Sequence, residues 1–292
     1  MKIVDCTSFY SEHMMYDVRL KILKDKVDKF IDTESTYSHS GKKKKLNFDI
    51  SNYPKFKDKI IHVVIDKEPD GIVPENNNPS LQRSNSLKRI ALSYDESLKA
   101  LKESSDEDLI MLSDNDEIPN LNSKDFATNK KDIVLFKQLF FYFRFNLLYD
   151  RMHWFGTKGC KKKKLKSLSW LRNIKLKKYP FWRLDSLFSE TKQINLQIIQ
   201  DGGWHFTNLK TPEEMYEKFM NFGHHDEFRL SGLTIEKIRE KIKNKEMFYD
   251  HFADQSSTNK WKSDYKLKKY DSSLLPKYLS DNQNKYKEWF DD

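Results

Sequence analysis

Hydrophobic positions change their period repeatedly along the first 120 residues. Short apolar runs rich in β-branched residues occur at residues 2–6, 27–33, 60–66 and 108–113, and such runs are typical of strands. Between them, residues 12–26 carry Met14, Val18 and Ile22 four apart, which predicts a helix, and residues 81–91 and 95–102 also have helical patterns. This order predicts an α/β fold with a mainly parallel central sheet flanked by helices.

The pattern after residue 130 is less regular. Residues 132–148 include VLFKQLFFYFRFNLL, which predicts one or two strands with large core side chains. Thr211-Pro212-Glu213-Glu214 has the form of a capping box, and Thr234 precedes an apolar stripe, so each predicts a helix start. A final amphipathic segment is expected near the C-terminus. Residues 68–79 and 158–168 are predicted loops too short to divide the chain, so one domain over residues 1–292 is expected.

The composition of the chain excludes few classes of protein. Hydrophobic residues make up 37% of the chain, and aromatic residues at 14% add core material. The net charge of +9 permits attraction to nucleic acid, an anionic membrane or a phosphorylated molecule, and it selects none of them. The two cysteines indicate no disulfide framework. Without a run of about 20 apolar residues or a signal-peptide layout, we expect a cytoplasmic protein with no integral membrane segment, in a microbial or virus-infected host cell.

Two lysine runs raise the question of nucleic-acid binding. Residues 42–45 and 161–164 are uninterrupted lysines beside glycines. Single-strand binders interleave aromatic and basic residues, so solvated loops explain these runs better and no nucleic-acid partner is expected. The sequence also lacks GxxxxGK[ST], GxGxxG, HExxH and GxSxG motifs, which argues against P-loop hydrolysis, dinucleotide binding, zinc proteolysis and serine hydrolysis.

The stretch LIMLSDNDEIPN sets a buried-looking strand directly against three carboxylates. Asp114 and Asp116 are two apart in a predicted turn, so both can face one point, and their oxygens suit Mn²⁺ or Mg²⁺. Ligands of parallel sheets bind beyond the carboxyl ends of the strands, where this turn is expected. The alternative is an acidic surface turn that closes the strand.

Two aromatic segments supply further candidates. In GGWHF, the glycines permit close backbone approach, and His205 is either a core histidine or a third metal ligand, with Trp204 beside it. In WFGTK, Trp154 can stack on a sugar while Thr157 and Lys158 supply a hydroxyl and a cation for an acceptor or a phosphate. A turn around a buried tryptophan explains the second segment equally well.

These segments together resemble glycosyltransferase family 17, which includes the β-1,4-mannosyl-glycoprotein β-1,4-N-acetylglucosaminyltransferases that add bisecting N-acetylglucosamine. The resemblance runs from IVDCTSFYSEHMMYDVRL through DKIIHVVIDKEP, SDNDEIPN, WFGTK and GGWHFTNLKTPEEM to LPKYLSDNQNKYKEW. SDNDEIP and GGWHF are its most specific pieces. The animal relatives carry an N-terminal membrane anchor, which we do not expect in this protein, so the resemblance leaves the acceptor undefined.

The resemblance implies a GT-A-like fold and metal-dependent inverting transfer from a nucleotide sugar, typically UDP-N-acetylglucosamine, to a glycan. It implies a nucleotide-sugar-binding half at residues 1–120 and an acceptor-side half at residues 121–292. Asp114 and Asp116 match the family's Asp-x-Asp pair, and His205 matches the histidine of its Gly-Trp-His motif. The donor-binding positions that the resemblance implies are Glu12, Arg19, Glu34, Arg83 and Asn115.

An inverting transfer also needs a base for the acceptor hydroxyl. Glu227, which follows a histidine-rich turn, is the first choice, and Asp201, just before the paired glycines, is the second. Two other classes of protein remain open at this point. One is a non-catalytic glycan-binding module that uses Trp154 and Trp204 as stacking platforms, and the other is a nucleic-acid-binding protein.

Overall fold

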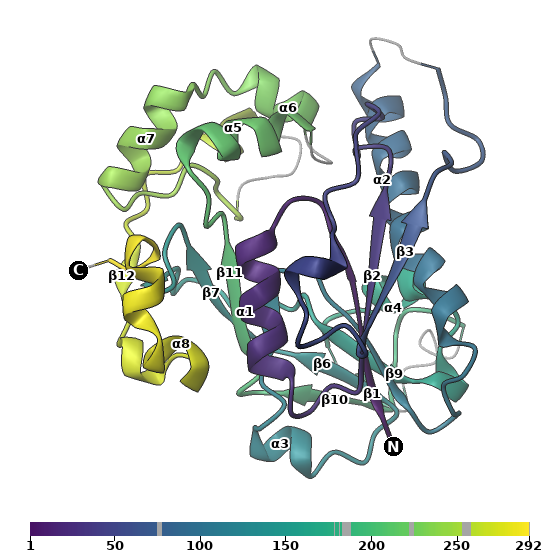
Figure 1. Ribbon diagram of the computed structural model, residues 1–292. Helices are drawn as coiled ribbons and strands as arrows, with labels where there is room; N and C mark the ends of the chain where they lie inside the picture. Colours follow the sequence, from purple (N-terminus) through teal and green to yellow (C-terminus); the bar gives the residue numbers. More distant parts are fainter. Residues whose placement is uncertain are drawn as a thin grey trace.

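The computed structural model describes residues 1–74, 78–177, 179–180, 182, 188–221, 225–252 and 258–291, and its strands form two sheets (Figure 1). Within these residues the larger sheet has seven strands in the order β10-β6-β9-β4-β1-β2-β3. Their bounds are β1 Ile3–Ser8, β2 Lys29–Ser35, β3 Ile60–Ile65, β4 Leu109–Leu112, β6 Ile133–Phe136, β9 Lys158–Lys161 and β10 Leu196–Ile199. The smaller sheet contains β5 Glu117–Pro119, β7 Leu139–Tyr142, β8 Leu147–Leu148, β11 Gly203–Thr207 and β12 Lys268–Lys269.

Helices cover the faces of the larger sheet and extend the C-terminal part. The α-helices are α1 His13–Leu23, α2 Pro79–Asp95, α3 Lys124–Ala127, α4 Leu168–Asn173, α5 Pro212–Asn221, α6 His225–Leu230, α7 Ile235–Lys243 and α8 Lys277–Asp281. Figure 1 shows α5, α6 and α7 grouped together, with α6 on the side of the group nearest to α2. The predicted α/β class, with a mainly parallel sheet flanked by helices and a helical C-terminal part, is confirmed.

The order of the strands creates a place for a ligand. β1 pairs in parallel with β2 on one side and with β4 on the other. The chain therefore leaves β1 in one direction and returns to its other side, which is a topological switch point. Such crevices beyond the carboxyl ends of strands are where α/β sheets bind ligands. β1 ends at Ser8 and β4 ends at Leu112, two residues before Asp114.

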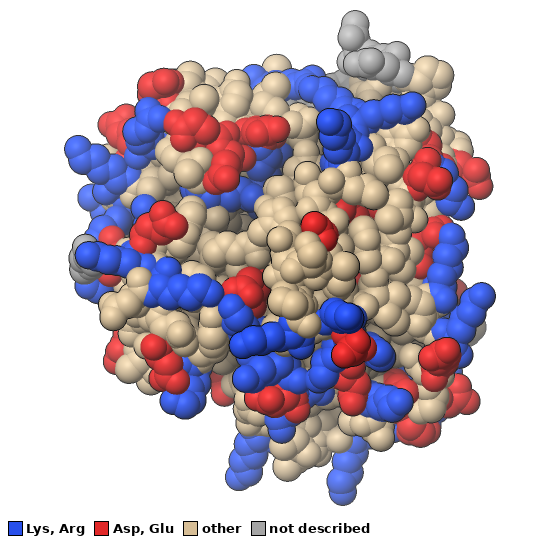
Figure 2. Space-filling view, in the orientation of Figure 1, with Lys and Arg blue, Asp and Glu red and all other residues tan. Residues whose placement is uncertain are grey.

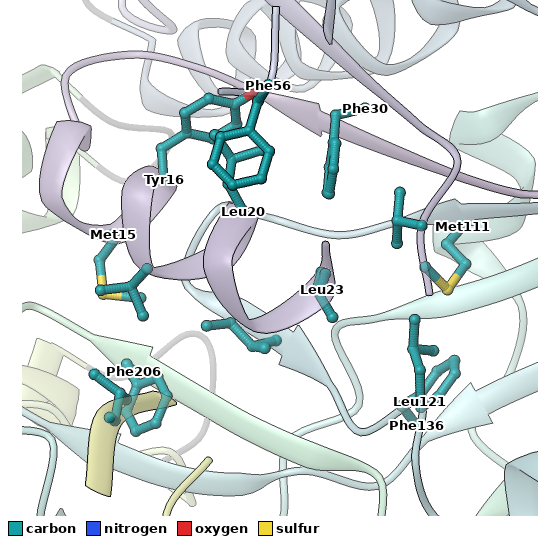
Figure 3. Close-up of a cluster of buried hydrophobic side chains, with 14 of the residues drawn as sticks. Met15, Tyr16, Leu20, Leu23, Phe30, Phe56, Met111, Leu121, Phe136 and Phe206 are labelled. Carbon is teal, nitrogen blue, oxygen red and sulfur yellow. The ribbon is translucent and has the colours of Figure 1, made fainter. Parts of the chain in front are cut away.

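Alternation along the strands separates two cores. Leu109 and Met111 of β4 face a cluster that also contains residues of α1, while Ile110 and Leu112 face a second cluster that includes Leu168 of α4. Figure 3 shows the first cluster, in which side chains from α1, from the larger sheet and from Phe206 of β11 pack together. Burial on both faces explains why these strands have continuous apolar sequences.

A third cluster lies on the other face of the smaller sheet. It packs Phe140 and Tyr142 of β7 against Met215, Phe219 and other residues of the α5–α7 group. Both predicted helix starts are confirmed: the Thr211 amide donates to Glu214 Oε2 (2.9 Å), and the Glu214 amide donates to Thr211 Oγ1 (3.2 Å). Thr234 Oγ1 likewise accepts from the amide of Lys237 (3.3 Å).

Two predictions of local structure were wrong. Residues 158–168 are not a loop, because β9 begins at Lys158 and runs antiparallel between β4 and β6. The aromatic run of residues 132–148 forms β6, β7 and β8, which is one strand more than the pattern predicted. The predicted loop at residues 68–79 extends in part over residues outside the described chain, and α2 begins at Pro79.

Candidate active site

The acidic loop that follows β4 is held at the switch point by backbone and side-chain hydrogen bonds. The Ser113 amide donates to Cys6 O (3.0 Å), and Asn115 Nδ2 donates to Ser8 O (2.9 Å), so both contacts tie the loop to the end of β1. The Glu117 amide donates to Asp114 O (3.0 Å) and closes a turn. The turn presents Asp114 and Asp116, and their side chains are 39% and 18% exposed.

The pairing of β5 with β11 brings His205 to this loop. His205 is opposite Glu117 in the antiparallel pair, and the Phe206 amide donates to Asp116 O (2.8 Å). His205 Nε2 consequently lies 3.4 Å from Asp116 Oδ1. Burial raises the pKa of the Asp116 carboxyl, but attraction to His205, a hydrogen bond from it and attraction to Lys218 together outweigh burial, so the pKa is lowered.

The two glycines before His205 permit this pairing. A Cβ on Gly202 would lie 2.3 Å from Lys137 N. A Cβ on Gly203 would lie 2.3 Å from Ile118 O, and Gly203 has a φ of +109°. The prediction that the glycines serve close backbone approach is therefore confirmed.

His205 is fixed between two aromatic rings. Its imidazole stacks on Phe140 at 4.6 Å between ring centroids and on Trp154 at 4.8 Å. His205 Nδ1 is buried and has no hydrogen-bond partner among the residues that the structure describes. The stacking limits rotation of the ring, so Nε2 stays directed at Asp116.

A network of charged side chains on the buried side of the acidic loop orients the loop. Glu117 is fully buried and accepts from Trp154 Nε1 (2.6 Å) and from Arg172 Nη1 (3.0 Å). It also accepts from the Asp114 amide, which donates to Glu117 Oε2 (2.8 Å). Arg172 Nη2 also donates to Asp114 Oδ2 (2.8 Å), and Tyr94 OH donates to Asp114 Oδ1 (3.0 Å). Burial raises the pKa of Asp114, against the attraction of Arg172.

Three cavities meet at Asp116. The arginine cavity, of about 330 Å³, is lined by Ser8, Tyr10, Glu12, His39, Arg83, Ile90, Ser93, Tyr94, Asp114, Asn115, Asp116, Arg172 and Lys218. The aromatic cavity, of about 310 Å³, is lined by Asp114, Asp116, Phe140, Tyr142, Trp154, His205, Thr207, Asn208, Lys218, Phe219, Phe248, Tyr249, His251 and Trp261. The α1–α5 cavity, of about 260 Å³, is lined by Ser11, Glu12, His13, Met14, Met15, Asp116, Phe206, Asn208, Leu209, Lys210, Glu214, Lys218 and Trp289.

The predicted donor-binding residues divide into two groups. Glu12, Arg83 and Asn115 line the arginine cavity. Asn115 is 5% exposed, and its Oδ1 is buried without a hydrogen-bond partner among the described residues. An unsatisfied buried acceptor at a cavity wall is a ready partner for an N–H or O–H group of a ligand.

Arg19 and Glu34 have internal roles instead. Arg19 is fully buried, donates to both carboxylate oxygens of Asp5 (2.7 and 2.6 Å) and donates to Glu117 O (2.5 Å). Glu34 accepts from Lys44 Nζ and from the backbone amides of residues 47 and 48. Burial raises the pKa of Glu34, but hydrogen bonds from His62, Lys44 and these amides lower it to about 2. Arg19 supports the backbone of the acidic loop, and Glu34 supports the backbone at residues 47 and 48. Neither residue lines the cavities at Asp116.

Of the predicted acceptor-binding residues, the structure brings Trp154 to the site. Trp154 lines the aromatic cavity. Thr157 is fully buried, with its hydroxyl 2.9 Å from that of Ser113, and Lys158 Nζ donates to Ile174 O (2.8 Å). Trp204 lines a separate cavity between α1, β5 and α8. Successive side chains of a strand point to opposite faces, so Trp204 and His205 face different ways.

The two predicted bases are not brought to Asp116. Glu227 is on α6 and forms an ion pair with Lys260 (2.5 Å). Asp201 precedes β11 and accepts from Asn120 Nδ2 (2.8 Å). Neither lines any of the three cavities.

Three residues of the site were not predicted from the sequence: Arg172, Tyr94 and Lys218. Arg172 and Tyr94 reach Asp114 from α4 and α2, which are distant in sequence, and no local motif marks them. Lys218 is the second residue, after Asp116, that lines all three cavities. Lys218 is four residues after Glu214 on a capped helix, which places both side chains on one helix face. Both side chains line the α1–α5 cavity, so this spacing was the sequence signal that could have identified Lys218.

Asp116 and His205 are the residues that fit a divalent cation. They offer a carboxylate oxygen and an imidazole nitrogen 3.4 Å apart at the junction of the cavities, whereas Asp114 is held by Arg172 and Tyr94. Within the described part of the chain, no three histidine, cysteine, aspartate or glutamate side chains are gathered as a metal site. A cation here would therefore take its remaining ligands from a bound phosphate and water, as Mg²⁺ commonly does.

Comparison with protein families gives a match that spans nearly the whole chain. The model of glycosyltransferase family 17 matches residues 1–290. The chain belongs to this family. It is accordingly a glycosyltransferase, with a donor and an acceptor as substrates, and the resemblance seen in the sequence is confirmed.

Other comparisons add less. A search of curated proteins finds no match. Among solved structures, the chain is similar to the inositol-1-phosphate CTP transferase from T. maritima, with 13% identity, a TM-score of 0.35 and coverage of 82% of this chain and 97% of that chain. Among the described residues, no helix is both long and apolar enough to cross a membrane.

Proposed function

We propose that this glycosyltransferase moves N-acetylglucosamine from UDP-N-acetylglucosamine to a hydroxyl of a glycan, with inversion and with Mn²⁺ or Mg²⁺ held by Asp116 and His205. The single observation that carries the proposal is the position of Asp116, which lines both the arginine cavity and the aromatic cavity. A group held at Asp116 is thus next to ligands in both cavities.

The arginine cavity suits the nucleotide part of the donor. It lies beyond the ends of β1 and β4, where α/β sheets bind nucleotides. Arg83 in its wall is a cation that suits phosphate oxygens. Asn115 Oδ1, buried in the same wall without a partner among the described residues, can accept from the base or the ribose.

The aromatic cavity suits the acceptor sugar. Its wall combines Trp154 and Tyr249 with the polar side chains of Thr207 and His251. Burial lowers the pKa of His251 to about 4, so this imidazole is neutral near pH 7 and can exchange hydrogen bonds with hydroxyl groups. Apolar walls with a few polar groups are typical of small-molecule sites.

The transfer requires charge stabilisation and a base. When bound, the cation neutralises charge on the leaving diphosphate as a Lewis acid. Asp114 lines both cavities, so its carboxylate is placed to accept the proton of the acceptor hydroxyl. Burial raises the pKa of Asp114, which makes this carboxylate a stronger base. This position favours Asp114 as the base over Glu227 and Asp201. Glu117 and Arg172 hold Asp114 in place.

A ligand screen tests the proposal. UDP-, GDP- and other nucleotide sugars are compared for stabilisation and hydrolysis, with Mn²⁺ and with a chelator. We expect the UDP sugar to raise the melting temperature and to release UDP only with the metal. Stabilisation by free glycan with no response to any nucleotide sugar would contradict the proposal and favour a binding module.

A further inference from the structure

The junction of the three cavities contains a cation that the proposed function does not yet use. Lys218 extends from α5, whereas Arg83 and Arg172 come from α2 and α4. Asp116 and Lys218 are the two residues common to the linings of all three cavities. Any ligand that crosses from the arginine cavity to the aromatic cavity past Asp116 therefore also passes Lys218.

Lys218 is available for such a ligand. Its Nζ donates to Asn208 Oδ1 (3.3 Å), which is a neutral partner. Among the described residues, no carboxylate lies within 4.0 Å of this ammonium group, although surface lysines such as Lys277 are paired. A half-buried ammonium without an ion pair is costly unless an anion binds beside it.

The charges around the arginine cavity support the same conclusion. Its lining carboxylates are Glu12, Asp114 and Asp116, and its lining cations are Arg83, Arg172 and Lys218. Arg172 is already paired with Asp114 and Glu117. Without Lys218 the wall would carry an excess of negative charge, which would repel a diphosphate.

We propose that Lys218 contacts the diphosphate of the donor and stabilises it as the leaving group. This inference rests on the proposed function. The bond between the anomeric carbon and the diphosphate oxygen breaks, and its electron pair stays on that oxygen. The acceptor oxygen forms the new bond and loses its proton to Asp114, while Lys218 remains protonated. An ammonium fixed beside the developing charge stabilises it more than water can.

The helix α5, which carries Lys218, is anchored to the rest of the fold at its start and along its buried face. α5 begins at a reciprocal capping box and buries Met215 and Phe219 against the third core cluster. The same helix therefore links the fold of the C-terminal part to the leaving group.

Binding of UDP and of uridine to wild type, Lys218→Met and Lys218→Arg tests the inference by calorimetry. We expect Lys218→Met to weaken UDP binding about tenfold or more, to leave uridine binding unchanged and to lower kcat for the UDP sugar. Lys218→Arg should recover most of the UDP affinity. Lys237→Met, which removes an exposed lysine from α7, is the matched control and should behave as wild type.

The outcomes separate the two proposals. Equal loss of UDP and uridine binding in Lys218→Met, or no loss of either, would overturn the role of Lys218. Failure of wild type to bind any nucleoside diphosphate would instead remove the proposed function on which the inference rests. If Lys218→Met does not fold, Lys218→Gln is measured by the same criteria.

Discussion

Glu117 shows how much of the site depends on one buried carboxylate. In the sequence it is the third acidic residue of the stretch LIMLSDNDEIPN. In the structure it is fully buried and joins Trp154, Arg172 and the backbone of Asp114. Burial raises its pKa, but attraction to Arg172 and His205 and the hydrogen bond from Arg172 together outweigh burial. The pKa is therefore lowered, and Glu117 is charged at neutral pH. Its role is to orient the catalytic loop.

Gly156 gives a way to disturb Glu117 without changing it. A Cβ at Gly156 would lie 1.8 Å from Glu117 Oε1, so Gly156→Ala must displace that carboxylate. We expect a loss of stability of about 1–3 kcal/mol, as for an overpacked core, and a larger loss of kcat. Urea unfolding and a UDP-release assay measure the two effects.

Gly232→Ala is the control for this prediction. Gly232 has a φ of +69° and open space around its Cα, so alanine there adds backbone strain without a clash. Its kcat should remain that of wild type. If both alanine variants have the same kcat, the role of Glu117 in orienting the loop is wrong.

Asp32 predicts a pH dependence of stability. It is buried on β2, where Thr7 Oγ1 donates to it (2.5 Å) and Tyr16 OH donates to its other oxygen. Burial raises its pKa from 3.8 to about 7. The folded state thus binds a proton more tightly than the unfolded state, so the contribution of Asp32 is present at low pH and is lost as the pH rises from about 4 to about 7.

The corresponding measurement compares wild type with Asp32→Asn in urea between pH 5 and pH 8. The wild-type free energy of unfolding should fall more steeply with rising pH than that of the variant. Identical pH slopes would contradict the assignment of a raised pKa to Asp32.

At the residue scale, the site residues that could be predicted from the sequence are those that belong to local motifs. Asp116 and His205 are brought together, as expected of metal-ligand candidates, although binding of a metal stays a prediction. Arg19 and Glu34 became internal supports because their partners, Asp5 and Lys44, lie on other segments. Such partners depend on how strands pair, which no local pattern shows.

At the scale of elements, boundaries followed from caps and periodicity where those signals were strong. α5 and α7 begin where Thr211 and Thr234 predicted. β9 was missed because Lys158-Gly159-Cys160-Lys161 has no β-branched residue. A Cβ at Gly159 would lie 2.8 Å from Val134 Cγ2, so this strand is selected by close packing between β4 and β6 rather than by propensity.

The capping box of α5 makes a prediction at this scale. Thr211→Ala removes the hydroxyl that accepts from the Glu214 amide, and we expect a loss of about 1 kcal/mol in the free energy of unfolding. Thr128→Ala, at an exposed threonine that donates to Lys124 O, is the control and should cost less. Urea unfolding measures both, and an equal cost would show that the box contributes nothing specific.

At the scale of the whole molecule, much of the charge on one face lies away from its middle. On the face shown in Figure 2, lysines, arginines and acidic residues gather mainly around the periphery, and the middle is mostly uncharged. The net charge of +9 by itself selects no substrate. The α/β class could be predicted from the strand–helix pattern, whereas the joining of the second sheet and the α5–α7 group around one loop could not.

The central claim is that Asp116 holds a divalent cation beside the donor diphosphate. The direct measurement is UDP release from UDP-N-acetylglucosamine by wild type and by Asp116→Asn, each assayed with Mn²⁺ and with a chelator. Asp281→Asn, on the exposed end of α8, is the matched control. We predict that wild type and Asp281→Asn require the metal and that Asp116→Asn loses about 100-fold or more in kcat. Metal-dependent turnover at the wild-type rate in Asp116→Asn would contradict the account.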